Sequence, residues 1–342
     1  SYSGPTWYVQ TDGSDTDGTG ASATPFASIQ SAINFATTDG DSVTVAAGTY
    51  YEHVNTRDRE IDIVGQGPGV SIIDGSSTYR TVSINSTVLF SGFTIQNGYV
   101  YRGGGMNIDA QNVSVENCHF TNNSSSGGGD HLQLGTGGVI IKECAFTNNL
   151  SNYPIHADFG NQGGTFINCF VDANGHSVAF ESNGYPSIIN STIVNYSEIA
   201  YTCHADSDAV IINSVFYPAP GSSDTKVAGS TRDDATIDVT VDYCIFPEEA
   251  VDFELTGGGS VTYGDNNITG YPVFADTANG DYHLSDLSPA IGAGTASITI
   301  DDVTYTAPTT DLDGNPRPNP AGTVPDMGAY ESDKGVDPNY AG

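Results

Sequence analysis

The sequence predicts an all-β fold, a right-handed parallel β-helix solenoid with a short N-terminal capping helix and an irregular C-terminal cap. Three observations support this prediction. The middle of the chain repeats a short apolar strand, a polar corner and a second apolar strand roughly every 22 to 26 residues, the length of one stacked coil. Glycine (41 residues) and proline (16) supply many turns, and the 37% of hydrophobic residues can fill an interior. Helical periodicity is nearly absent.

The repeats align well with one another. Residues 113–120 (VSVENCHF) match residues 139–146 (VIIKECAF), and residues 165–170 (TFINCF) continue the series. Alternation with period two places one set of side chains inside the solenoid. The aligned interior includes a row of small residues, namely Cys118, Cys144, Cys169, Ser191 and Ser214. Because serine continues this row, we interpret the cysteines as interior fillers that need no disulfide.

An asparagine-rich corner follows the second strand of successive repeats. Asparagine tolerates a left-handed backbone and bonds its own backbone, so it suits a tight corner. Stacked at one corner, the amides can pair from coil to coil. The residues at this corner are Asn122, Asn123, Asn148, Asn149, Asn174 and Asn195.

The two ends of the chain differ from the repeats. Phe26, Ile29, Ile33 and Ala36 recur at helical spacing, which predicts a short helix that covers the open first coil. We therefore expect an N-terminal strand, an Asp/Gly turn and the capping helix over residues 1–40. The coils follow over residues 41–270, and the C-terminal cap and tail over residues 271–342.

The ends also carry a resemblance to known proteins. The segments WYVQTDGS (7–14), ATPFASIQSAI (23–33) and DSVTVAAGTYYE (41–52) resemble secreted pectate-lyase-like β-helix proteins. The segments DYHLSDLSPAIGAG (281–294), DLDGNPRP (311–318) and VPDMGAYE (324–331) are similar to the choice-of-anchor Q domain, which closes many bacterial and archaeal surface β-helix proteins. The resemblance implies the fold and an extracellular life. It does not imply one chemistry, because the superfamily includes lyases, hydrolases, adhesins and structural proteins.

Charge excludes several classes of partner. The net charge is −32, from 41 acidic residues against nine Lys plus Arg, and such a surface repels nucleic acids and anionic membranes.

No apolar stretch reaches the roughly 18 residues of a membrane span. The sequence begins at Ser1 without an initiator Met. We therefore expect an extracellular or cell-surface protein after signal-peptide removal.

One predicted sheet carries a polar ladder. Aligning the strands that precede the asparagine–cysteine corner turns one set of polar side chains outward, namely Asn107, Asp109, His131, Gln133, His156, Asp158, Glu181, His204 and Asp206. In one hypothesis Asp158 and Glu181, on neighbouring rungs, act as the carboxylate pair of a retaining glycosidase. His156 then assists proton transfer, and the glycan is bound by Asp109, His131, His204 and Asp206.

Two other hypotheses explain the same ladder. His131, His156 and His204 could bind a metal together with Asp158, because imidazole and carboxylate ligands suit zinc and similar ions. Alternatively the ladder is an ordinary solvated or self-associating face, since polar ladders also arise for structural reasons. A lyase is harder to support. It must neutralise a uronate carboxylate, and the ladder contains neither Lys nor Arg; Lys142, Arg80 and Arg102 lie elsewhere in their coils.

Two further groups of charged residues stand out. Asp12, Asp15 and Asp17 lie in one Asp/Gly-rich segment, whose carboxylate density suits calcium although the EF-hand spacing is missing. A turn explains the segment equally well. Near the other end, Arg317 is expected to pair with Asp326 or Glu331.

Two functions follow from these observations. The first is an extracellular structural or adhesive protein, plausibly a filament or surface-layer subunit that associates head to tail when residues 1–9 and 334–342 extend a neighbour's sheet. The alternative is a secreted polysaccharide-degrading enzyme, a glycoside hydrolase or metal-assisted lyase that uses the outward ladder. The sequence favours the first slightly.

Overall fold

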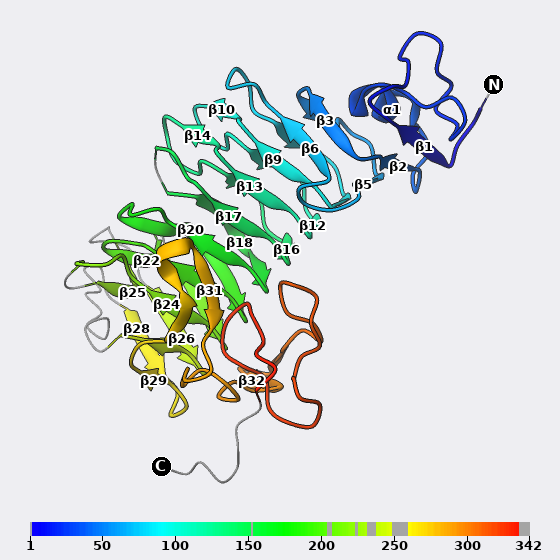
Figure 1. Ribbon diagram of the computed structural model, residues 1–342. Helices are drawn as coiled ribbons and strands as arrows, with labels where there is room; N and C mark the ends of the chain where they lie inside the picture. Colours follow the sequence, from blue (N-terminus) through cyan, green and yellow to red (C-terminus); the bar gives the residue numbers. More distant parts are fainter. Residues whose placement is uncertain are drawn as a thin grey trace. The chain divides into compact units, whose positions relative to one another are not determined.

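The computed structural model describes residues 2–151, 153–203, 207–222, 225–230, 237–247 and 259–334. The chain divides into two compact units, Ser1–Gly164 and Thr165–Gly342. Each is built mainly from short parallel strands stacked coil on coil (Figure 1). The predicted parallel β-solenoid is therefore confirmed. Among the described residues, no helix has both the length and the apolar character needed to cross a membrane.

The first unit has three rows of parallel strands. The first row consists of β1 (Thr6–Val9), β2 (Ser42–Val45), β5 (Asp62–Val64), β8 (Leu89–Ser91), β12 (Ser114–Glu116) and β16 (Ile140–Lys142). The second row consists of β3 (Gly48–Tyr51), β6 (Ser71–Asp74), β9 (Thr94–Gln96), β13 (His119–Thr121) and β17 (Ala145–Thr147). The third row consists of β4 (Val54–Asn55), β7 (Val82–Ile84), β11 (Met106–Ile108), β15 (Leu132–Leu134) and the start of β18 (Ile155–Ile167). Between the second and third rows, β10 (Tyr99–Val100) pairs with β14 (Ser124–Ser125).

The second unit repeats this plan with longer strands. One row consists of the end of β20 (Val178–Ile189), β23 (Ser207–Ile212), β26 (Ile237–Asp242) and β28 (Gly259–Tyr263). A second consists of β19 (Phe170–Asp172), β21 (Thr192–Val194), β24 (Val215–Tyr217), β27 (Ile245–Phe246) and β29 (Ile268–Thr269). A third consists of the start of β20, β22 (Ile199–Cys203) and β25 (Lys226–Ser230).

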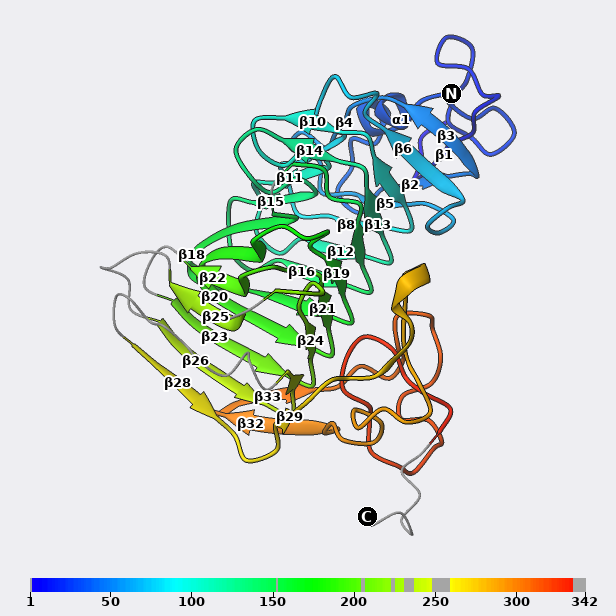
Figure 2. The ribbon, with the colours of Figure 1, turned by 60° about the vertical axis from the view of Figure 1, so that its left-hand side comes forward.

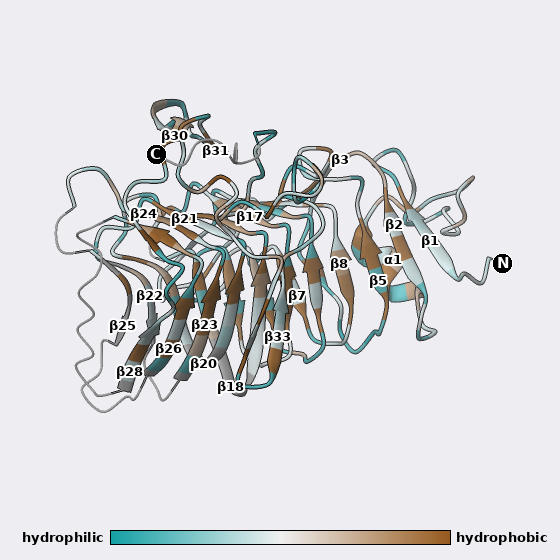
Figure 3. Ribbon diagram, turned by 90° about the horizontal axis from the view of Figure 1, so that it is seen from below, coloured by the Kyte–Doolittle hydropathy of each residue, from teal (hydrophilic) through white to brown (hydrophobic). Residues whose placement is uncertain are grey.

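Apolar side chains fill the interior of both units, and apolar and polar residues alternate along the strands (Figure 3). The predicted row of small residues is inside, because its five members are 0–1% exposed. The thiols are free rather than bonded to one another. Each turns back toward its own backbone: Cys118 Sγ lies 3.2 Å from the Glu116 carbonyl and Cys144 Sγ lies 3.2 Å from the Lys142 carbonyl. The prediction of interior fillers is confirmed for these residues.

Two corners of the coils use the left-handed backbone. At the predicted corner, Asn122, Asn148, Asn174 and Asn195 have φ between 53° and 57°. A second corner, between the first and second strands of each coil, also has φ near +50°, at residues that include Asn117, Asn168, Asn190 and Asn213. Asparagine occupies this conformation at lower cost than most residues, so both corners follow from the sequence.

The N-terminal helix is shorter than predicted but uses the predicted face. Helix α1 (Ile29–Phe35) begins after Ser28, whose side chain accepts a hydrogen bond from the Ser31 N–H. The carboxylate of Glu52 accepts two further N–H groups of the first turn, from Ile29 at 2.8 Å and Gln30 at 2.9 Å. These bonds satisfy donors that a helix start leaves free. The predicted face (Phe26, Ile29, Ile33 and Ala36) is 0–1% exposed.

Strand β1 has both edges occupied within its own chain. One edge pairs with β2. On the other edge, Tyr8 donates its N–H to the Gly20 carbonyl, Phe26 donates to the Tyr8 carbonyl, and Gln10 donates to the Phe26 carbonyl. The first coil is therefore closed by residues 20–26 as well as by α1.

The C-terminal segment, residues 271–334, contains two antiparallel hairpins and irregular turns. The hairpins are β30 (Phe274–Asp276) with β31 (Asp281–Leu284), and β32 (Ser297–Ile300) with β33 (Val303–Thr306). A 3-10 turn, η2 (Thr277–Asn279), joins the first pair. The segment returns along the second unit, beside its strands (Figure 2). Asn168, Asn190 and Asn213 bind backbone carbonyls of Thr310, Asp326 and Thr295, respectively.

Arg317 anchors this segment through a buried ion pair. Its Nε lies 2.9 Å from Glu331 Oε2, and both side chains are fully buried. Nη1 donates to Asn168 Oδ1 and Nη2 donates to the Gly328 carbonyl. The expected pairing is thus made with Glu331.

Candidate functional site

Three residues of the predicted polar ladder, Asn107, Gln133 and His156, lie side by side in the third row of the first unit. Strand register places Asn55, Ser83, Asn107, Gln133 and His156 at equivalent positions on five successive strands. Neighbouring rungs of such a sheet lie about 4.8 Å apart. The alignment of Asn107, Gln133 and His156 that the sequence predicts is therefore correct.

This ladder is nearly closed to solvent. Asn107, Gln133 and His156 are 7%, 8% and 5% exposed. The backbone of the adjacent turns covers these side chains. A Cβ added to Gly103 would lie only 2.7 Å from the Gln133 Cβ, and one added to Gly129 would lie only 3.0 Å from the His156 Cβ. Only glycine allows these turns to lie so close to the strands.

His131 corrects one detail of the prediction. Counting back from Leu132 would turn it outward, but β15 begins at Leu132, so His131 belongs to the preceding turn. Its ring is fully buried, 6.2 Å from the Phe146 ring, and its Nδ1 lies 3.1 Å from the Asn123 amide nitrogen. Burial lowers the pKa of His131 to about 3. A neutral, enclosed imidazole of this kind is not available to a glycan.

Asp109 remains accessible at the end of the same row. It is exposed and accepts a 2.6 Å hydrogen bond from the amide of Asn107. Its charge also acts on Arg80, a residue of a nearby turn, where it partly offsets the lowering of the Arg80 pKa by burial. Asp109 is the one predicted glycan-binding residue that the described structure places on an open surface.

The remaining predicted residues belong elsewhere. Glu181 lies in β20 of the second unit, and it is 7% exposed. Its neighbour Phe180 is inside, with its ring 4.6 Å from that of Phe166, so alternation turns Glu181 outward. Register places Thr202 of β22 beside Glu181. The side chain of Asp158 and all of His204 and Asp206 lie outside the described residues.

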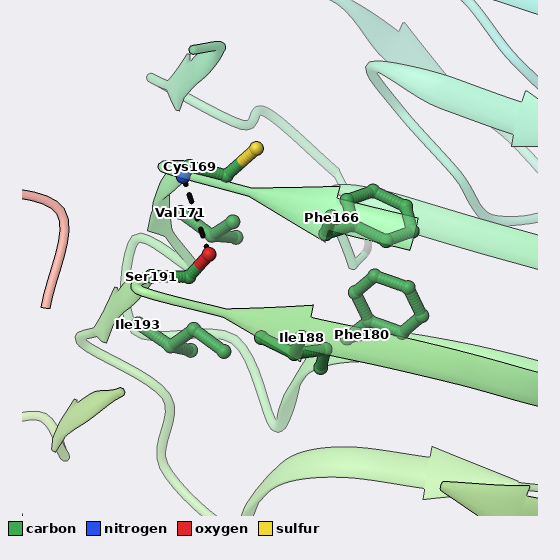
Figure 4. Close-up of a pocket in the computed structure, with 7 residues that line it drawn as sticks. All are labelled: Phe166, Cys169, Val171, Phe180, Ile188, Ser191 and Ile193. Atoms are coloured by element: carbon green, nitrogen blue, oxygen red, sulfur yellow. Dashed lines mark hydrogen bonds between the residues drawn. The ribbon is translucent and has the colours of Figure 1, made fainter. Parts of the chain in front are cut away.

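The core of the second unit contains a small apolar cavity of about 10 Å³ (Figure 4). It is lined by Phe166, Cys169, Val171, Phe180, Ile188, Ser191 and Ile193. The one polar contact among these residues is internal, because the Cys169 N–H donates to Ser191 Oγ at 3.2 Å. A space of this size and apolar lining suits neither water nor a ligand.

The aspartates proposed for calcium do not converge. Asp12 and Asp17 border a surface hollow of about 240 Å³, whereas Asp15 Oδ1 accepts the N–H groups of Ala27 and Ser28 at 2.9 and 3.0 Å. Burial raises the pKa of Asp15, but these hydrogen bonds outweigh it and the net shift is downward. Among the residues that the structure describes, no three His, Cys, Asp or Glu side chains form a metal-binding group. Calcium binding stays a prediction.

Four exposed tyrosines form a surface feature that the sequence patterns did not single out. They come from three successive coils of the first unit: Tyr51 is the last residue of β3, Tyr99 is the first residue of β10, and Tyr79 and Tyr101 lie in bends between the second and third rows. Tyr51, Tyr79, Tyr99 and Tyr101 are 73%, 65%, 48% and 65% exposed, respectively. We call these four residues the tyrosine strip. Each tyrosine ends or follows the second strand of its coil, a signal that an alignment of the segments between the second and third strands could have found.

Comparisons with known proteins support the fold. No protein-family model matches the chain, and no curated protein matches it. The structure of pectate lyase Pel9A aligns over 95% of this chain and 96% of its own, with a TM-score of 0.59 and 14% sequence identity. Likeness at this identity shows that the two chains share a parallel β-solenoid fold.

Two pectin methylesterases give weaker alignments. The enzyme from carrot has a TM-score of 0.44 and 14% identity over 82% of this chain and 91% of its own. The enzyme from Aspergillus niger has a TM-score of 0.42 and 13% identity over 83% and 91%. These scores are too low to support any argument about this chain.

Proposed function

We propose that this protein is an extracellular enzyme that cleaves polysaccharide by hydrolysis, with Glu181 as a catalytic carboxylate. The observation that carries the proposal is the position of Glu181. It is turned outward from the hydrophobic interior, yet it is only 7% exposed. Acidic side chains are rarely so buried without a specific reason. Pectate lyase Pel9A, whose fold this chain resembles, makes a polysaccharide the first class of substrate to test.

A shielded carboxyl group suits general acid catalysis. In a pair of catalytic carboxyl groups one donates a proton to the leaving oxygen, and Glu181 is proposed for this role. The hypothesis drawn from the sequence names Asp158 as the second carboxylate and His156 as the group that assists proton transfer; the side chain of Asp158 lies outside the described residues.

The choice of hydrolysis over β-elimination rests on the lack of a cation in the ladder of the first unit. A lyase must neutralise the carboxylate of a uronate before it removes the adjacent proton. The ladder of the first unit contains Asn, Ser, Gln and His but no Lys or Arg. Lys142 pairs with Glu143 at 3.2 Å. This ladder thus offers no cation for elimination, whereas the row of the second unit that contains Glu181 includes Lys226 in β25.

Head-to-tail assembly has less support. It requires a free sheet edge at residues 1–9, whereas β1 is bonded to β2 on one side and to residues 20–26 on the other. Of residues 334–342, only Lys334 lies among the described residues. The N-terminal half of the proposed junction is therefore already occupied.

The proposal is tested by release of new reducing ends from a panel of neutral and acidic polysaccharides. Wild-type protein, Glu181→Gln and Asp158→Asn are compared, with Glu198→Gln as the matched control, because Glu198 is an exposed glutamate of the same unit. We expect at least a hundredfold loss of rate for Glu181→Gln and wild-type rate for Glu198→Gln. Absence of cleavage by wild type, or equal rates for the two Gln variants, would refute the assignment.

A further inference from the structure

We infer that the tyrosine strip is a binding site for a neutral polysaccharide, separate from the proposed catalytic residues. The inference rests on the proposed function for its class of ligand and on the first unit for its geometry. Large aromatic side chains are costly to leave in water, and a group of them on one surface marks a binding site more often than chance exposure does. Tyrosine rings present flat apolar faces to the C–H groups of sugars, and their hydroxyls bond sugar hydroxyls.

The strip runs along the solenoid axis. The second-row strands β3, β6 and β9 are hydrogen-bonded neighbours. Tyr51 ends β3, Tyr79 comes after β6, and Tyr99 and Tyr101 come after β9. Tyr99 donates its backbone N–H to the Tyr79 carbonyl at 3.0 Å, so these two residues lie on adjoining coils. Exposed aromatic side chains on adjoining coils suit a linear polymer better than a small molecule.

Neighbouring residues fix the position of Tyr101. A Cβ on Gly127, in the next coil, would lie 2.6 Å from the Tyr101 ring, so the glycine backbone packs against the ring. The Arg102 guanidinium lies 5.6 Å from the ring centroid. The ring is thus held in place while the residue remains 65% exposed. Such preorganisation reduces the entropy lost on binding.

The arginines beside the strip are used for structure rather than for an anionic ligand. Arg80 donates from Nε to the Gly103 carbonyl at 3.0 Å and from Nη2 to the Arg102 carbonyl at 2.9 Å. Arg102 donates from Nε to the Gly127 carbonyl at 3.2 Å. These bonds tie successive turns together. The charge of Asp109 acts on Arg80, which reduces the positive potential of the strip.

Electrostatics therefore selects the ligand class. The chain carries a net charge of −32, so a polyanion approaching the strip meets long-range repulsion that one exposed guanidinium does not cancel. A neutral glycan carries no charge and so meets no such repulsion. The aromatic faces provide the contact area, and the guanidinium and phenol groups provide hydrogen bonds to sugar hydroxyls.

Binding can be measured separately from cleavage. The full chain with Glu181→Gln is titrated with the neutral polysaccharides laminarin, galactomannan and hydroxyethylcellulose, and with polygalacturonate and alginate, each at low and at high salt. Into this chain we introduce the pair Tyr79→Ala and Tyr101→Ala. We expect the parent chain to bind a neutral polysaccharide with an affinity that does not depend on salt. We expect this affinity to be at least tenfold lower in the double Ala variant.

Two controls make the result specific. The pair Tyr79→Phe and Tyr101→Phe keeps the ring faces and should keep most of the affinity, and a thermal melt of each variant checks its fold. Tyr271→Ala removes a tyrosine of the second unit that is 57% exposed and should bind as the parent does. Equal affinities of the double Ala and Tyr271→Ala variants, binding of the acidic polymers alone, or no binding at all would overturn the inference. Cleavage that persists when the same two Ala substitutions are made in the chain that keeps Glu181 would leave the proposed function intact.

Discussion

Asn213 binds Thr295 through both atoms of one side-chain amide: Nδ2 donates to the Thr295 carbonyl at 2.8 Å, and Oδ1 accepts the Thr295 N–H at 2.8 Å. The two residues are 82 positions apart in the sequence. Asn213 is 1% exposed and has a left-handed backbone with φ of 52°. Asn213 thus forms the corner of a coil with its backbone and holds the C-terminal segment of the second unit with its side chain.

Replacing Asn213 with Ala should loosen this segment. The side chain loses three hydrogen bonds, two with Thr295 and one donated to Asn190 Oδ1 at 3.1 Å, at roughly 1 kcal/mol each, and alanine in a left-handed conformation adds about 1 kcal/mol. We expect the free energy of unfolding to fall by about 2–4 kcal/mol, with faster hydrogen exchange around residue 295. Asn117→Ala is the matched control, because Asn117 has φ of 48° but is exposed. Equal effects of the two variants would mean that the amide contributes little.

Removal of the Arg317 guanidinium should have a larger effect. Arg317→Met leaves Glu331 buried without its cation, beside Asp326, and burial already raises the pKa of both carboxyl groups. Breaking one side of a buried ion pair costs about 3–5 kcal/mol. Chemical denaturation would show this loss. The substitution Lys334→Met removes an exposed cation and should change stability by less than about 0.5 kcal/mol; similar losses in both variants would contradict the account.

Acid should destabilise the first unit through His131. Burial lowers its pKa from the ordinary 6.5 to about 3, so between these values the unfolded chain binds a proton that the folded chain does not. Stability is therefore lost as the pH falls below about 6.5, by up to about 1.4 kcal/mol per pH unit. In His131→Gln this dependence should be weaker. Denaturation midpoints measured from pH 7 to pH 4 give the pH dependence of stability for each protein. The same dependence in wild type and His131→Gln would exclude His131 as its cause.

The thiols should be unreactive in the folded protein. Cys118, Cys144, Cys169 and Cys244 are free and 0–1% exposed, and burial raises the pKa of Cys244. Only the thiolate reacts with an alkylating reagent. Peptide mapping after brief iodoacetamide treatment should find these four residues unmodified, and modified once the protein is denatured. A reducing agent should leave the melting temperature unchanged, whereas a large decrease would indicate a disulfide.

The sequence predicted those features that depend on local pattern. The buried face of α1 follows from the spacing of Phe26, Ile29 and Ile33, and the interior thiol row follows from alternation within each repeat. The burial of His131 did not follow, because alternation ceases where a strand ends and the turn bends the side chain inward. The contact between Asn213 and Thr295 did not follow either, since no local pattern reveals which distant segment a corner amide will bind.

The candidate site was predicted only in part. Register within the first unit confirms the row of Asn107, Gln133 and His156, because strand pairing is fixed by the repeat. Its shielding was not foreseen, since it depends on how closely Gly103 and Gly129 lie over the strands. The tyrosine strip was missed because turns vary in length and disrupt the alignment on which the prediction rested.

Cleavage of polysaccharide in water enriched with ¹⁸O tests the central claim most directly. Hydrolysis adds one oxygen atom from water at each new reducing end, whereas elimination adds none. Mass spectrometry of the products should find ¹⁸O at the new ends for wild type and for Glu198→Gln, and almost no product for Glu181→Gln. Unlabelled, unsaturated products, or labelled products formed equally fast by Glu181→Gln, would contradict a hydrolase that acts through Glu181.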